Sequence, residues 1–320
     1  MGMWAPHPET TVDPAVGPGL LVEGGTTGTL EGPEVAVKPR SMFRRGWEVF
    51  AENRLALVGL GFIVFVFLFS FVGPLIYKTQ QNLVSLNDAY CTPSAQHLLG
   101  CDQLGYDIVG RLMVGGQNSL TVGIAAAFVA CLFGSIYGAV SGFAGGVVDT
   151  ILMRFVDAML SIPFIFVLII LAVLIHPSRI TMIGFIAVTY WPGPARLVRG
   201  ETLSLRTREY VAAVKVAGGS SRRAVLRHVM PNAIGTIIVQ ATFAVADAII
   251  ILASLGFIGF GIQEPQTDWG AMLSNGLNYL SLGYWWMIYP AGLIIIATVV
   301  AFNFVGDALR DAFETRLQRR

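Results

Sequence analysis

The sequence predicts an all-α membrane protein with six transmembrane helices and a charged cytoplasmic loop. Of its 320 residues, 54% are hydrophobic and 13% are charged, a composition typical of multispanning membrane proteins. Apolar segments of about 20 residues recur along the chain, and at ~1.5 Å per residue each is long enough to cross a ~30 Å hydrocarbon core as a helix. Lysine and arginine are concentrated in the connections on one side of these segments.

The chain before the first apolar segment has two parts. Residues 1–40 contain six prolines and little apolar periodicity, which predicts a disordered cytoplasmic tail. This tail lacks a basic start followed by a short apolar core, so we expect no cleavable signal peptide. Residues 41–54 combine arginines with Trp47 and Phe50, a pattern that favours an amphipathic helix at the membrane interface.

Six apolar segments are expected to span the membrane. An external loop of residues 77–118 follows the first span, a transmembrane core covers residues 119–306, and residues 307–320 form a cytoplasmic C-terminal segment. In the fourth span, Trp191-Pro192-Gly193-Pro194 predicts a kink or a helix end. The expected spans are residues 55–76, 119–143, 151–175, 180–198, 233–261 and 285–305.

The basic residues predict the orientation of the chain. With these spans, 18 of the 21 lysines and arginines lie on one side, and only Lys78, Arg111 and Arg179 lie on the other. Because cytoplasmic loops carry the excess of basic residues, both termini and the loop of residues 207–231 are expected in the cytoplasm. An even number of spans agrees with this placement.

The loop of residues 207–231 is predicted to form two short helices with a glycine break between them. Thr207 is suited to cap the first helix, Glu209 lies in its first turn, and Gly218-Gly219 ends it. Pro231 suits the first turn of the span that follows. The alternative is an ordinary basic cytoplasmic loop. Four residues at helical spacing form an apolar ridge that fits a groove on another protein: Tyr210, Ala213, Val214 and Ala217.

Two of the three cysteines fall in the external loop. Cys91 and Cys101 are ten positions apart there, so an oxidising compartment allows a disulfide between them. The alternative is two free thiols. A metal site is not favoured, because His97 is the one further ligand nearby. Cys131 lies inside the second span.

Small and acidic residues within the spans also need an explanation. Asp157 and Asp247 are acids at or near membrane depth, where such groups usually face a partner or a water-filled path. For Asp157 we favour a pair with Arg154. For Asp247, a place in a pathway and a buried, hydrogen-bonded place are both compatible with the sequence.

Three glycines repeat every fourth residue along the second span, where a helix of this chain or of a partner is able to pack closely: Gly134, Gly138 and Gly142.

The residue order in the cytoplasmic loop resembles a known motif. Gly218 is followed thirteen positions later by Pro231, as in the coupling loop, or EAA loop, of ATP-binding-cassette (ABC) importer permeases. The Glu-Ala-Ala triplet of that family falls on Ala212-Ala213-Val214, so Ala212 replaces the usual glutamate. The shared feature is the shape of the loop rather than a charge at position 212.

Further segments resemble the second, C-type permease subunit of dipeptide, oligopeptide or nickel importers. The external segment of residues 97–107 follows the family pattern His-x-x-Gly-Thr-Asp-x-x-Gly-Arg-Asp, except that Cys101 replaces Thr and Tyr106 replaces Arg. Leu252 stands where the family often has a glutamate, so substrate contacts cannot be transferred to that position. The other similar segments are residues 191–199, 268–273 and 302–311.

The resemblance implies a type I ABC importer permease. Such a subunit forms half of a translocation pathway for di- or oligopeptides and works by alternating access, with the apolar ridge docking on an ATPase. Within the family, nickel or another small solute is the alternative substrate. An ion channel is the alternative from another class, but the chain has neither a repeated pore motif nor rings of charge.

The partners follow from the same resemblance. No lysine of this chain follows a glycine, so it lacks a Gly-Lys-Ser/Thr phosphate-binding loop and is not expected to be an enzyme. The resemblance implies that two partner ATPase subunits or domains bind ATP and Mg²⁺, and that this chain binds no cofactor. It also implies a homologous second permease, an extracellular solute-binding protein and membrane lipids, without nucleic acid, in a bacterial plasma membrane.

Overall fold

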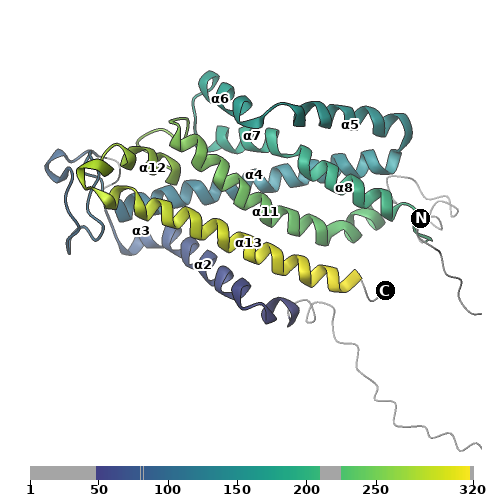
Figure 1. Ribbon diagram of the computed structural model, residues 1–320, viewed down its shortest axis with the longest axis horizontal. Helices are drawn as coiled ribbons and strands as arrows, with labels where there is room; N and C mark the ends of the chain where they lie inside the picture. Colours follow the sequence, from purple (N-terminus) through teal and green to yellow (C-terminus); the bar gives the residue numbers. More distant parts are fainter. Residues whose placement is uncertain (1–47, 80, 82, 210–224, 318–320) are drawn as a thin grey trace, which may run out of the picture. The chain divides into compact units, whose positions relative to one another are not determined.

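A computed structural model of the chain describes residues 48–79, 81, 83–209 and 225–317 (Figure 1). The predicted tail of residues 1–40 and most of the predicted coupling loop lie outside the described residues. Of the expected interfacial segment, residues 48–54 are described; residues 48–52 are helical, and Arg54 is the first residue of α2. Within the described ranges the chain forms helices and no β-strand, in agreement with the expected all-α membrane protein.

The long helices follow the apolar segments of the sequence. Short 3-10 turns occur at Leu86–Asp88, Leu280–Leu282 and Trp285–Met287, and a π-helix, Val225–Val229, leads directly into α11. The α-helices are α2 (Arg54–Phe71), α3 (Gly73–Ile76), α4 (Ile108–Ala144), α5 (Gly146–Ser161), α6 (Phe164–Leu174), α7 (Arg179–Tyr190), α8 (Pro192–Leu205), α11 (Met230–Phe257), α12 (Trp269–Leu277) and α13 (Tyr289–Leu317).

Side-chain caps fix where several of these helices begin. Asn53 accepts hydrogen bonds from the first backbone N–H groups of α2, and Asp107 accepts one from Gly110 at the start of α4. Ser178 and Thr181 form a capping box at α7, and Asp268 caps α12. At the far end of α4, Gly145 has φ +67°, a left-handed conformation that glycine adopts without strain.

The described residues contain four helices long and apolar enough to cross a membrane, or five when one bent pair counts as a span. The four are α2, α4, α11 and residues 285–313. The expected third span is a pair of helices, α5 and α6, bent by 77°. Because Pro163 separates them and lacks a backbone N–H, one straight helix cannot continue through this point.

The expected fourth span is also divided. α7 ends at Tyr190 and α8 begins at Pro192, as the Trp191-Pro192-Gly193-Pro194 segment predicted. α7 has 12 residues and a length of ~18 Å, which is shorter than a ~30 Å hydrocarbon core. The division leaves α8 as a separate helix that leads to the cytoplasmic loop.

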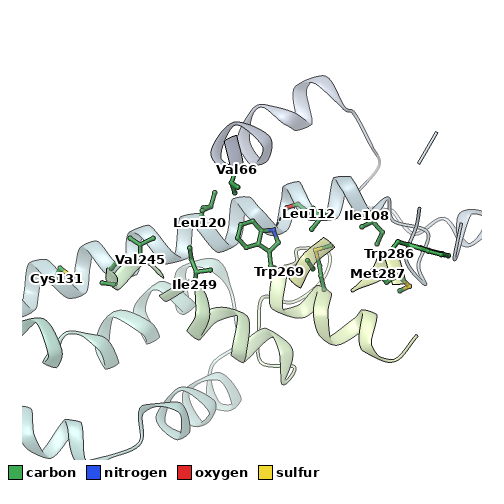
Figure 2. Packing of buried hydrophobic residues seen from close by; sticks show 14 residues of the cluster. Val66, Ile108, Leu112, Leu120, Cys131, Val245, Ile249, Trp269, Trp286 and Met287 are labelled. Carbon is green, nitrogen blue, oxygen red and sulfur yellow. Dashed lines mark hydrogen bonds between the residues drawn. The ribbon is translucent and has the colours of Figure 1, made fainter. Parts of the chain in front are cut away.

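α4 lies at the centre of the bundle and contacts α2, α7, α8 and α11 (Figure 1). Its apolar residues pack with those of α11, α12 and α2 in one large buried cluster. Figure 2 shows Trp269 of α12 in this cluster, pointing toward α4, where its indole N–H donates a 3.0 Å hydrogen bond to the Leu112 carbonyl oxygen. α12 is therefore held against the N-terminal half of α4 by both apolar and polar contact.

The glycine repeat of α4 packs against α8 of the same chain. A Cβ added at Gly134 would meet the Trp191 carbonyl oxygen, and one added at Gly142 would meet Arg199 and Thr202. At Gly138 the added atom would overlap the carbonyl oxygen of Ala195. The strip thus allows the two backbones to approach closely, which settles the question of its partner that the sequence left open.

Gly138→Ala is expected to destabilise the protein. The new methyl group collides with a backbone carbonyl, which cannot move aside as a flexible side chain does, so α4 and α8 must separate at a cost of about 1–3 kcal/mol. The thermal midpoint of the purified chain in detergent measures the effect. Gly200→Ala on α8 is the matched control, because a Cβ there meets nothing within 4 Å. Equal midpoints for the two variants would contradict the close packing.

Candidate functional site

The described ends of the predicted cytoplasmic loop lie at the end of α8 and the start of α11. α8 ends at Leu205, Glu209 is exposed, and Pro231 lies in the first turn of α11, where a proline was expected. Thr207, expected as a helix cap, donates a hydrogen bond back to the Ser204 carbonyl oxygen. The remaining predicted coupling residues lie outside the described part: Tyr210, Ala213, Val214, Ala217, Gly218 and Gly219.

A polar network clamps α8 to the turn between α4 and α5. Arg199 donates two hydrogen bonds of 2.6 Å to the Asp149 carboxylate, which also accepts one from Ser141. Arg206 donates to the Gly142 carbonyl oxygen at 2.9 Å. Bidentate arginine–carboxylate pairs fix both distance and orientation, so the helix that leads to the loop is held rigidly. From the sequence, these arginines were expected only as part of the basic residues on the cytoplasmic side.

Asp157 has a different partner from the one expected. Its carboxylate accepts a hydrogen bond from Arg196 of α8 rather than from Arg154 of its own helix. α5 and α8 pack side by side, which brings Arg196 to the acid although the two are 39 positions apart in sequence. The Arg196 contact therefore adds a second, more exposed link between these helices.

A second polar network organises the external loop. The Asp107 carboxylate is buried and accepts hydrogen bonds from Gly110 N–H and from the Tyr77 hydroxyl, and it lies 3.0 Å from His97 Nδ1. Asp102 is also buried and accepts hydrogen bonds from Leu104 and Tyr106 N–H groups. Burial raises the pKa of Asp102 despite these hydrogen bonds.

The two departures from the family pattern in this loop have local explanations. The Tyr106 ring lies under the Arg111 guanidinium, whose central carbon is 4.5 Å from the ring centroid. Arg111 is buried and also donates to the Pro265 carbonyl oxygen at 2.8 Å. Cys101 forms a disulfide with Cys91, and its carbonyl oxygen accepts a hydrogen bond from the Trp286 indole. The substituted residues thus tie the loop to α4 and to the segment before α13.

The disulfide accounts for a cluster with metal-ligand residue types. Ligand atoms of Cys91, His97 and Cys101 lie within 4.8 Å of one another. Both sulfurs are bonded to each other, and His97 is in contact with Asp107. The arrangement serves the packing of the external loop.

Asp247 lies on an exposed part of α11. Its neighbours Ala246 and Ala248 are buried, but its own side chain is exposed, which excludes the buried alternative for this chain in isolation. The Tyr190 hydroxyl at the end of α7 donates a 2.5 Å hydrogen bond to Asp247 Oδ2. Tyr190 could not be predicted as the partner of Asp247, because two residues 57 positions apart give no local signal in the sequence. Leu252 on the same helix is fully buried in an apolar cluster.

The fold and these networks define a multispanning membrane protein in which α8 is rigidly held, and the comparisons with known proteins identify its family. Residues 112–319 match the binding-protein-dependent transport system inner membrane component family, and residues 41–93 match the N-terminal TM domain of oligopeptide transport permease C. The chain belongs to this family of transport permeases, as the motif resemblance implied. Members of the family are membrane transport subunits and not catalytic enzymes.

Curated relatives cover most of the chain. It is 39% identical to the dipeptide transport system permease protein DppC of Bacillus subtilis. The 273 matched residues cover 85% of this chain and 85% of the relative. It is 36% identical to the oligopeptide transport system permease protein OppC of the same organism, over 94% of this chain and 99% of the relative. OppC of Escherichia coli is 35% identical over 93% of this chain and 99% of its own length.

Loss of the disulfide is expected to destabilise the external loop. Closing a loop of this length reduces the entropy of the unfolded chain, with a contribution of about 2–3 kcal/mol. A thiol reductant should therefore lower the thermal midpoint of the wild-type protein, and Cys91→Ser should lower it to a similar value. The reductant should have no further effect on Cys91→Ser. An unchanged wild-type midpoint after verified reduction would contradict this role.

The buried carboxyl of Asp268 is expected to make the stability of the protein depend on pH. Burial raises the pKa of its carboxyl to about 6, whereas an unfolded aspartate titrates near about 3.9. The folded state therefore binds the Asp268 proton more tightly than the unfolded chain does. The resulting contribution to the free energy of unfolding is fully present below about pH 4 and is lost as the pH rises through about 6. Asp268→Asn keeps an oxygen that caps α12 and should flatten the decline in thermal midpoint between pH 4 and 7. The same slope in variant and wild type would refute the assignment.

Proposed function

We propose that this chain is a permease subunit of an ATP-driven importer of di- or oligopeptides. The observation that carries the proposal is its similarity, along most of its length, to relatives named as dipeptide and oligopeptide permeases. These names favour peptides over nickel or another small solute. The chain then forms half of the translocation pathway, and a homologous second permease forms the other half.

Further parts of the transporter follow from this assignment. Two ATPase subunits or domains bind ATP and Mg²⁺, and an extracellular solute-binding protein delivers the peptide. The distribution of basic residues supports a cytoplasmic location for both termini and for the loop of residues 207–231. The disulfide between Cys91 and Cys101 supports an external location for the loop at the other end of α4, since such bonds persist in oxidising compartments.

The mechanism is alternating access driven from the cytoplasmic loop. In this proposal Tyr210, Ala213 and Ala217 dock on an ATPase, and Gly218-Gly219 sets the angle between two short helices. Closure of the ATPase pair moves this loop. α8 precedes the loop and is joined to the α4–α5 turn through Arg199 and Asp149. Because this connection is rigid, a movement of the loop also moves α8 and the helices packed against it.

Uptake by the reconstituted transporter tests the proposal directly. The complete complex, with permease partner, ATPases and binding protein, is placed in liposomes and supplied with ATP and a labelled di- or tripeptide. ATP-dependent accumulation of the peptide supports the assignment. Uptake of Ni²⁺ in place of peptide would establish the alternative substrate, and ATP-independent ion flux would establish a channel.

Gly218→Val is expected to uncouple transport from ATP hydrolysis. A β-branched residue is strained in the left-handed conformation predicted at the helix end, so the angle between the two short helices changes. Peptide uptake should fall by at least about tenfold while the complex still assembles and hydrolyses ATP. Gly193→Ala is the control, because a Cβ there meets nothing within 4 Å. Wild-type uptake by Gly218→Val would defeat the coupling assignment.

A further inference from the structure

Three polar residues divide α11 at regular intervals. They are seven positions apart, which is two helical turns, so they share one face at separations of ~10.5 Å. Asp247 and Ser254 are exposed, whereas the residues on either side of Asp247 are buried alanines. The helix also contains Asn232, Thr236 and Thr242. The three residues at seven-residue spacing form a polar stripe: Gln240, Asp247 and Ser254.

The stripe points away from the centre of the bundle. Val245 and Ile249 of α11 point toward α4 (Figure 2) and belong to its buried cluster. At 3.6 residues per turn, Asp247 lies about 180° around the helix axis from the midpoint of these two residues. The carboxylate therefore lies on the face of α11 opposite its contact with α4.

Asp247 also lies deep within its helix. It is ~25 Å along the axis from Met230 and ~15 Å from Phe257, the two ends of α11. At such depth an ionised side chain facing lipid costs about 2.5–3.5 kcal/mol on insertion scales, and such residues face a cavity or a partner group. Because Asp247 is exposed in this chain, its face of α11 borders a water-filled space or another subunit.

The bonding of Asp247 leaves one carboxylate oxygen available. Tyr190 donates to Oδ2, which fixes the orientation of the carboxylate, and within the described ranges Asp247 forms no ion pair. A held carboxylate with a free oxygen is suited to bind a cation that donates hydrogen bonds. The metal-ligand grouping found among the described residues lies in the external loop, which disfavours a metal ion at Asp247.

We propose that Asp247, positioned by Tyr190, is an ammonium-binding subsite of the translocation pathway. It binds the protonated amino terminus, or a lysine side chain, of the peptide that crosses the membrane. The inference rests on the proposed peptide importer and adds a chemical group to its pathway. Gln240 and Ser254 lie on the same stripe, one on each side of the carboxylate, where their side chains can form hydrogen bonds with other polar atoms of the peptide.

Transport by variants of the complete reconstituted complex tests the subsite. Asp247→Asn keeps the shape and the acceptor for Tyr190 but removes the charge, so peptide uptake below saturation should fall on the order of tenfold, as expected for a lost charge-assisted hydrogen bond. Stimulation of ATP hydrolysis by the loaded binding protein should persist. Asp247→Glu should restore most of the uptake, and Ser254→Ala, on the same stripe, should reduce uptake far less.

The outcomes separate the inference from the function on which it rests. If the wild-type complex takes up no peptide, the proposed function fails. If the wild type takes up peptide and Asp247→Asn does so equally well, only the subsite is overturned. Equal loss of uptake and of stimulated ATP hydrolysis in Asp247→Asn would indicate a role in assembly or coupling and would also overturn it.

Chemical modification provides a test that does not depend on the activity of a variant. Asp247→Cys in the assembled complex should react with a charged, water-soluble thiosulfonate, and a transported peptide should slow the reaction several-fold. This chain contributes little background, because Cys131 is buried and Cys91 is bonded to Cys101. The same complex with wild-type Asp247 measures the background from the partner subunits. Absence of reaction in every nucleotide state would show that lipid or the second permease covers this face, which would overturn the subsite.

Discussion

The close approach of α4 and α8 determines how the rest of the bundle is arranged. Gly134, Gly138 and Gly142 remove the side chains that would hold the two backbones apart. In a bilayer, where apolar surfaces gain little by leaving lipid, such close contact supplies dispersion energy that larger residues cannot. The same approach brings Arg199 and Arg206 of α8 within hydrogen-bonding distance of the α4–α5 turn. Apolar packing and the polar clamp therefore depend on one glycine strip.

The end of the bundle that carries the disulfide is stabilised by a different kind of interaction. Asp102, Asp107 and Asp268 are almost entirely buried, and each accepts hydrogen bonds from backbone N–H groups that begin a helix or close a turn. Buried polar groups of this kind specify one conformation, because any other leaves them unpaired. The disulfide adds a covalent limit to the loop that surrounds them. The buried aspartates thus determine the conformation of the chain at this end of the bundle.

Hydropathy predicted four of the six expected spans, the long apolar helices among the described residues, whereas the expected third and fourth spans are each divided into two helices. It did not predict the 77° bend between α5 and α6, although Pro163 is a local signal for it. The glycine strip was recognised, but its partner was not, since spacing along one helix carries no information on the facing one. The partners of Asp157 and Asp247 lie 39 and 57 positions away. Pairs of this kind arise only when the helices pack.

α4 has a consequence for communication between the two sides of the membrane. It runs without interruption for 37 residues, from the Asp107 cap in one polar network to Gly145 beside the Arg199–Asp149 pair. A helix of ~55 Å is longer than the hydrocarbon core is thick, so one rigid element contacts both surfaces. If a ligand on one side of the membrane and a ligand on the other both bind one of two positions of α4 more tightly, each ligand changes the affinity for the other by the same factor. Under that condition, binding on either side of the membrane changes the affinity for the ligand on the other side.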